Sequence, residues 1–192
     1  MTKGRLEAFS DGVLAIILTI MVLELKVPRG EGLEALLPLL PVFLSYVLSF
    51  LYIGIYWNNH HHMLHTVQQV NGNILWANLH LLFWLSLIPF VTGWHGGHHR
   101  SAFPAALYGV VLFMAGFAYW ILQKAILKQH GKDSSLAQAV GKSLKERVST
   151  LLYLIAIGLA IIHPLLSDAI YVTVALIWLI PDRRIERVLY NR

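Results

Sequence analysis

Cysteine is absent from the 192-residue chain, and charged side chains make up only 13% of it, roughly half the share found in ordinary soluble domains. Without cysteine there is no disulfide framework, no thiolate metal site and no cysteine nucleophile. With so little charge and 57% hydrophobic residues, a disordered chain, a nucleic-acid-binding module and a typical water-soluble enzyme are all excluded. The composition predicts an integral membrane protein whose constant partner is the lipid bilayer and which binds no nucleic acid.

Six apolar segments approach the roughly 20 residues that a helix needs to cross a bilayer. They cover residues 6–27, 36–60, 74–94, 102–126, 148–166 and 169–180. The polar connector 123–147 is expected to contain a new helix start at Ser134 or Ser135. No internal repeat and no second soluble domain are visible. We therefore expect an all-α membrane protein with one six-helix transmembrane domain over residues 1–192.

Lysine and arginine are distributed unevenly between the two sides of this topology. Twelve of the fifteen lie at the N-terminus, in the fourth connector or in the tail, and three lie on the other side: Lys26, Arg29 and Arg100. Basic residues collect in cytoplasmic loops. Both termini are therefore expected in the cytoplasm, with the chain spanning the inner (plasma) membrane several times.

An acidic residue, Asp11, lies inside the first apolar segment. A charged side chain in a membrane helix is costly, and it usually faces protein or water. At about 100° per residue, Ser10 and Asp11 lie on one face of the helix. A second face carries branched apolar residues with one hydroxyl: Gly12, Ile16, Thr19 and Leu23, with Ile20 on its flank. Such a stripe could be functional, but ordinary packing against another helix would also require it. Spacing alone leaves both interpretations open.

Partners for Asp11 are sought at the same membrane depth. The first helix enters the membrane near Arg5, and the second returns to that side near Trp57 and His60. We therefore expect Arg5, Asp11, Trp57 and His60 to cluster, with charge-assisted hydrogen bonds satisfying a buried Asp11. Alternatively, His60 only marks the membrane interface.

Histidine is abundant, with ten residues in the chain. The groups at 60–65 and 95–99 resemble the boxes of membrane di-iron desaturases and hydroxylases, so a His-box di-iron oxidoreductase is the alternative function. The topology disfavours one shared centre, because the two groups lie on opposite sides of a bilayer core of about 30 Å. Surface Zn²⁺ or Ni²⁺ binding by His95, His98 and His99 stays plausible. We expect no enzymatic activity, no cofactor and no resident metal.

The first and second segments also carry a specific pattern. It consists of Arg5-x-x-x-Phe9-Ser10-Asp11, a following run of Ile, Leu and Thr, and Trp57-x-x-His60. This pattern resembles that of prokaryotic members of the transmembrane protein 175 (endosomal/lysosomal-type) potassium channel family, and the resemblance covers the whole chain. It implies a homotetramer whose four first helices line a central pore. It also implies a channel that prefers K⁺ to Na⁺, with K⁺ as the permeant ion.

The resemblance further implies roles for particular residues. Ile16 would form a narrow hydrophobic constriction, Thr19 a hydroxyl layer, and Ile20 and Leu23 the pore wall beyond them. A network behind the pore would consist of Arg5, Ser10, Asp11, Trp57 and His60, with Phe9 completing the signature. The constriction would replace a carbonyl filter, whose sequence Thr-Val-Gly-Tyr-Gly is absent.

Overall fold

In the computed structural model, every regular element within the described residues, 2–131 and 144–179, is helical. The short 3-10 turns Leu33–Ala35 and Leu37–Leu39 precede α2. The α-helices are α1 (Lys3–Leu23), α2 (Leu40–His65), α3 (Gly72–Ser86), α4 (Ile88–Gly97), α5 (Ala102–His130), α7 (Leu144–Ile162) and α8 (Pro164–Leu179). This confirms the predicted all-α fold.

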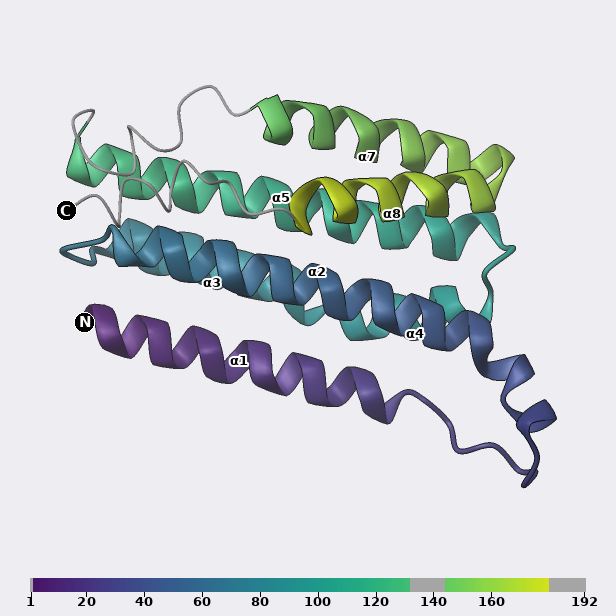
Figure 1. Cartoon of the computed structure of the whole chain (residues 1–192). Coiled ribbons are helices and arrows are strands. Elements are labelled where there is room, and N and C mark those ends of the chain that lie inside the picture. Colours follow the sequence, from purple (N-terminus) through teal and green to yellow (C-terminus); the bar gives the residue numbers. More distant parts are fainter. Residues whose placement is uncertain (1, 132–143, 180–192) are drawn as a thin grey trace.

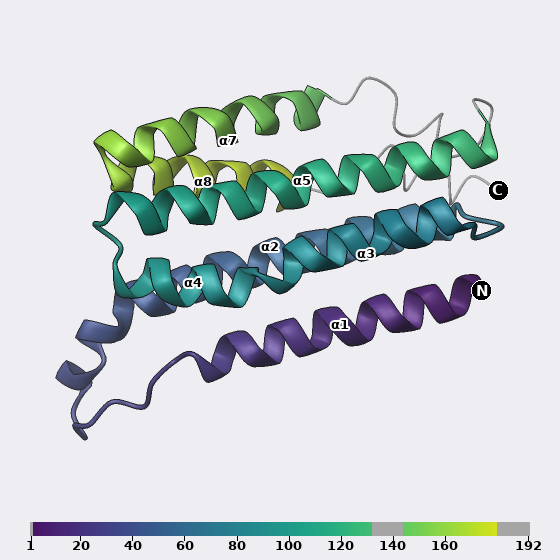
Figure 2. The same cartoon turned by 180° about the vertical axis from the view of Figure 1, so that it is seen from behind.

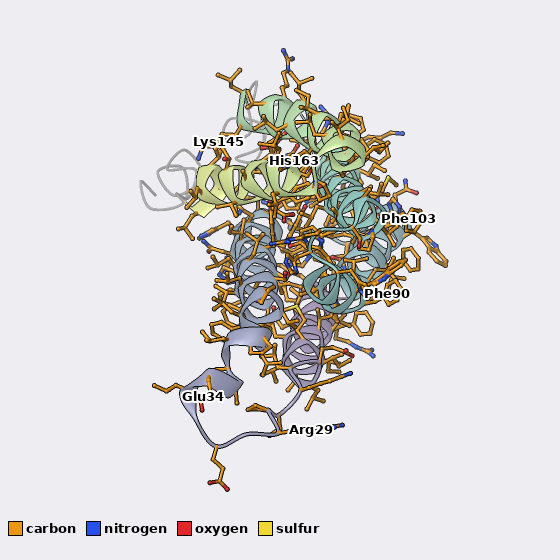
Figure 3. The ribbon with its side chains drawn as sticks, turned by 90° about the vertical axis from the view of Figure 1, so that its right-hand side faces the viewer. Arg29, Glu34, Phe90, Phe103, Lys145 and His163 are labelled. Carbon is orange, nitrogen blue, oxygen red and sulfur yellow. The ribbon has the colours of Figure 1, made fainter. Side chains whose placement is uncertain are left out.

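The helices run alongside one another and form a layered bundle (Figures 1 and 2). The helix α1 lies at one edge and packs against α2, α3 and α4. The helices α5 and α8 come next, and α7 closes the opposite edge. Viewed from the end opposite the N-terminus, the loop carrying Arg29 and Glu34 projects from the bundle, and Phe90 and Phe103 point outward (Figure 3). The outer position of α1 leaves one of its faces open.

Four helical segments are long and apolar enough to cross a membrane: 3–23, 33–65, 72–97 and 102–130. They overlap the first four predicted spans, although α1 ends at Leu23 and not at residue 27, and the other three segments extend past the predicted ends at residues 60, 94 and 126. Helical backbone is disfavoured at Val27, the predicted end, because that residue precedes Pro28. The chain is thus a multi-pass membrane protein. The predicted helix start at Ser134 or Ser135 lies outside the described residues.

The last two predicted spans, 148–166 and 169–180, have the wrong boundary. The helix α7 ends at Ile162, and Pro164 begins α8. A proline is tolerated in the first turn of a helix, where its missing N–H would have no partner, but it disrupts a helix interior. Pro164 therefore starts the last helix and does not lie inside the preceding one.

The third predicted span is divided into α3 and α4 at Leu87, with Pro89 in the first turn of α4. Proline removes a hydrogen bond and clashes with the carbonyl four residues earlier. The chain nevertheless stays hydrogen-bonded through the break, from Leu87 N–H to Trp84 O (3.3 Å) and from Val91 N–H to Leu87 O (3.2 Å). The span is therefore kinked, not interrupted by a loop.

The helices α5 and α8 approach each other closely at Gly109. Tyr171 of α8 is fully buried there, and its hydroxyl donates to the Ala105 carbonyl (3.0 Å). A Cβ atom at Gly109 would overlap the Tyr171 hydroxyl oxygen and would lie 2.9 Å from Cγ1 of Ile157. The contact between the two helices therefore requires a residue without a side chain at this position.

Gly109→Ala is expected to lower the free energy of unfolding by about 1–3 kcal/mol, the usual effect of overpacking a core. The midpoint of unfolding in an SDS titration of the detergent-solubilised protein measures this. Gly158→Ala on α7 is the matched control, because a Cβ there meets no atom within 4 Å and alanine is the better helix former. Equal midpoints for the two variants would contradict the close approach.

Candidate functional site

The helix α1 has a buried and an exposed face. The buried residues recur every three or four positions: Leu6, Ser10, Leu14, Ile17 and Met21. The predicted stripe is exposed, at 59% for Ile16, 43% for Ile20 and 78% for Leu23. Gly12 and Thr19 are exposed as well. The stripe faces away from the described part of the subunit, so packing within the subunit does not account for it.

A chain of buried polar side chains fastens α1 to α2 and α3. Ser10 and Asn78 are fully buried, and His60 is 3% exposed. The Ser10 hydroxyl donates to the Leu6 carbonyl (2.9 Å), and the Asn78 amide N–H donates to Ser10 Oγ (2.9 Å). His60 Nε2 lies 2.7 Å from Asn78 Oδ1. Because this oxygen can only accept, His60 must carry a proton on Nε2 and donate it.

Asp11 occupies a different environment from Ser10. The Trp57 indole N–H donates to Asp11 Oδ1 at 3.0 Å, which links α1 to α2 a second time. Asp11 is exposed in the subunit, and Trp57 is 48% exposed. The expectation of a buried Asp11 is therefore wrong for the subunit, although its pairing with Trp57 is as predicted.

Arg5 does not join either group. It is exposed, and among residues 2–131 and 144–179 no hydrogen bond or ion pair involves it. The reason is angular, since Arg5 lies about 140° around the helix from Ser10 and about 120° from Asp11. Phe9, the remaining signature residue, is 49% exposed. The predicted single cluster is thus two separate links, one through Ser10 and His60 and one through Asp11 and Trp57.

Asn78 is the residue that sequence reasoning missed. It joins Ser10 to His60, which share no hydrogen bond with each other among the described residues. A signal for it exists in the sequence, because an amide in the apolar segment 74–94 needs a hydrogen-bonding partner when buried. Its place near the start of that segment also puts it at the depth of His60.

The second histidine group does not converge on a metal site. His95 is buried, and its Nε2 lies 2.8 Å from Asp168 Oδ1 on α8, while its ring stacks on Tyr108. His98 bonds to the Trp94 carbonyl through Nδ1 (3.1 Å). No group of three or more metal-ligating side chains occurs in the part of the chain that the structure describes. Zn²⁺ or Ni²⁺ binding by His95, His98 and His99 together is therefore not supported.

Comparison with known proteins bears directly on this geometry. The family model for the endosomal/lysosomal potassium channel TMEM175 matches residues 5–89, a stretch that contains nearly all of α1, the whole of α2 and α3, and the buried polar chain. A potassium channel of Chryseobacterium sp. (strain P1-3) is 56% identical, over 98% of this chain and 98% of its own length. The chain belongs to the TMEM175 family.

Other TMEM175-family proteins agree with this assignment. A potassium channel of Streptomyces collinus is 32% identical, over 91% of this chain and 90% of its own. The crystal structure of a lysosomal potassium-selective channel TMEM175 homologue from Chamaesiphon minutus superposes with a TM-score of 0.79. It is 29% identical, and the match covers 94% of this chain and 97% of the other. The family and these relatives are channels and not enzymes, so the di-iron oxidoreductase alternative is unsupported.

Proposed function

We propose that this TMEM175-family chain forms a homotetrameric potassium channel that prefers K⁺ to Na⁺. In this proposal the four copies of α1 surround the pore, and Ile16 forms a hydrophobic constriction. The observation that carries it is the open stripe on α1, in which Ile16 is 59% and Leu23 78% exposed at the edge of the bundle. Relatives whose names describe them as potassium channels support the choice of ion.

A single stripe cannot enclose a pore, so several subunits must contribute one each. Cyclic closure is the common solution for identical subunits, because it places every stripe on one axis. A groove of about 780 Å³ runs beside the stripe, between α1 and the α3–α4 span, and is lined by Val13, Ile16, Ile20, Phe90 and Trp94 among others. We propose that a neighbouring subunit fills this groove. The family resemblance supports four copies.

The chemistry of the stripe suits a constriction of the proposed kind. Four converging Ile16 side chains would wall the pore with hydrocarbon, which offers an ion no replacement for its hydration shell and can block conduction by dewetting. Thr19 follows about 4.5 Å further along the axis. Its hydroxyl donates to the Ala15 carbonyl, which leaves the oxygen lone pairs available to a partly hydrated cation. Ions need no cofactor for this passage.

The buried polar chain supports the proposed pore face because it fixes the rotation of α1. Ser10 must face α3 to accept from Asn78 (2.9 Å). Turning α1 by one residue, about 100°, would break that bond and bring Ile17 into the place of Ile16. The Trp57–Asp11 bond adds a second restraint on the same helix. The buried polar chain and the Trp57–Asp11 bond therefore determine which side chains α1 presents to the proposed pore axis.

Charge distribution supports an inner-membrane orientation with both termini in the cytoplasm and six spans that include α7 and α8. The helix ends that are directed towards the start of α1 carry six described basic residues: Lys3, Arg5, Lys124, Lys128, Lys145 and Arg147. The opposite end holds Lys26, Arg29 and Arg100. The excess on the first side follows the positive-inside rule.

Purified protein in liposomes under a K⁺/Na⁺ gradient tests the proposal. We expect a reversal potential between zero and the K⁺ equilibrium potential, and native mass spectrometry of the same sample should give the mass of four chains. Protein-free liposomes are the control for leak. A reversal potential of zero would contradict the proposed preference for K⁺, and a conducting monomer or dimer would contradict the tetrameric pore.

A further inference from the structure

A second cavity lies inside the subunit, away from α1. Its volume is about 440 Å³, and α2, α5 and α7 form its walls, with Trp178 of α8 at one side. None of its lining residues belongs to α1 or to the buried polar chain. The volume is within the range of sites for small ligands, about 300–1,000 Å³. The proposed pore does not use this space.

The walls of the cavity are aromatic. Tyr52 and Tyr56 come from α2, Phe113 from α5 and Tyr153 from α7. At the outer edge Phe117 and Trp120 are 44% and 43% exposed, and their rings stack 5.7 Å apart. Tryptophan is enriched at the membrane–water interface. These walls suit hydrocarbon that enters from the membrane.

The mouth of the cavity is cationic. Lys124 of α5 and Arg147 of α7 line it, and both are exposed. Glu146 lines it too and accepts from the Gln123 amide (3.2 Å), which leaves a net charge of one positive unit at the mouth. Lys124 lies 5.7 Å above the Trp120 ring, so the cation is held beside the aromatic edge. An anionic group is the matching ligand here.

The dimensions point to a single lipid chain. From Phe113 to Lys124 the cavity follows α5 for about 16 Å, which is about half of the roughly 30 Å hydrocarbon core and so about one leaflet. Along that length, a volume of about 440 Å³ leaves room for one hydrocarbon chain and not for two.

We propose that this cavity binds one acyl chain of an anionic phospholipid. The phosphate of that lipid lies between Lys124 and Arg147, in the leaflet that surrounds the start of α1. Basic pockets between membrane helices are known to receive anionic headgroups. The site is intrinsic to one subunit, so it does not depend on the proposed pore or on the number of subunits.

Native mass spectrometry of the full-length protein, titrated with phosphatidylglycerol or phosphatidylcholine, tests the site. We expect one phosphatidylglycerol per subunit, and binding of phosphatidylcholine at least tenfold weaker. Arg147→Gln should weaken phosphatidylglycerol binding at least tenfold. Lys128→Gln is the matched control, because Lys128 lies one turn beyond Lys124 on α5, outside the cavity lining. This substitution removes the same charge from the same end of the bundle.

Gly116→Leu separates the cavity from surface attraction. Gly116 lines the cavity, and an added Cβ would meet only the Tyr56 hydroxyl oxygen, at 3.6 Å. Leucine should therefore occupy the acyl space, abolish stoichiometric lipid binding and leave both cations in place. Wild-type lipid affinity in both Gly116→Leu and Arg147→Gln would overturn the proposal, and so would equal affinity for the two lipids. Because lipid mass is the readout, failure here is independent of ion conduction.

Discussion

Ile16→Asn is expected to raise the K⁺ current several-fold and to bring the K⁺/Na⁺ permeability ratio close to one. Asparagine has as many side-chain heavy atoms as isoleucine but a smaller volume, and its amide holds water. In the proposed tetramer, a ring of four amides would therefore wet the proposed constriction, which hydrocarbon would otherwise keep dry. Current amplitude and reversal potential of the purified variant in liposomes give both quantities. Ile16→Val, which keeps the wall apolar, should retain the reversal potential of the parent protein.

Ile17→Asn is the matched control for the pore face. Ile17 is 3% exposed and belongs to the buried side of α1, whereas its neighbour Ile16 is 59% exposed. A buried amide at this position would have no hydrogen-bonding partner. The variant should therefore lower the free energy of unfolding by about 1–3 kcal/mol and reduce the yield of folded protein. Channels that do fold should keep the parent's reversal potential. If Ile16→Asn left conduction unchanged and Ile17→Asn altered it, the pore face would be misassigned.

Asn78→Leu is expected to destabilise the protein by about 1–3 kcal/mol, because the buried Nε2–H of His60 then has no acceptor. Ser10 Oγ also loses the amide that donates to it. The unfolding midpoint in SDS measures the loss. Because the rotation of α1 is no longer fixed, the variant should also show a less uniform single-channel conductance. Leucine has the same number of side-chain heavy atoms but a larger volume, so overpacking of this fully buried site adds to the loss.

Asn73→Leu is the control for Asn78→Leu. Asn73 lies in the first turn of the same helix but is exposed, so its replacement should change the midpoint by no more than about 0.5 kcal/mol. A double-mutant cycle of Ser10→Ala with Asn78→Leu should give a coupling energy above about 0.5 kcal/mol, as contacting residues do. Additive effects, or a midpoint for Asn78→Leu equal to that of Asn73→Leu, would show that the polar chain does not fasten α1.

The two faces of α1 could be predicted from sequence because helical spacing fixes angles within one helix. The angle between Ser10 and Ile16 follows from about 100° per residue alone, but spacing did not decide which side is exposed, and Asp11, expected to be buried beside Ser10, is exposed. The end of the second helix at the depth of Asp11 followed from topology, which is why the Trp57–Asp11 bond was anticipated. Composition predicted a membrane protein, and the lengths of the apolar segments predicted that its spans are helices.

Contacts between helices distant in the chain were not predictable in the same way. To predict the contact between Asn78 and Ser10, the rotation of α3 relative to α1 would have to be known. The His95–Asp168 pair joins residues that are 73 positions apart. The histidine spacing at 95–99 suggested a local site, but His95 is turned towards α8 by packing that no local pattern encodes. Arg5 was grouped with Asp11 by depth, although its angle around α1 separates them. Depth is therefore a weaker guide than angle.

The side-chain hydrogen bonds that hold α1 to other helices are confined to its first nine residues, 3–11. In the described ranges they join Lys3 to the His65 carbonyl, Ser10 to Asn78 and Asp11 to Trp57. Beyond that point α1 is held by apolar contacts such as those of Ile17 and Met21, which have no preferred direction. Mechanically the helix is a rod clamped at one end. Lateral displacement of such a rod grows with distance from its clamp, so the ring formed by Leu23 would vary more in diameter than the ring formed by Ile16.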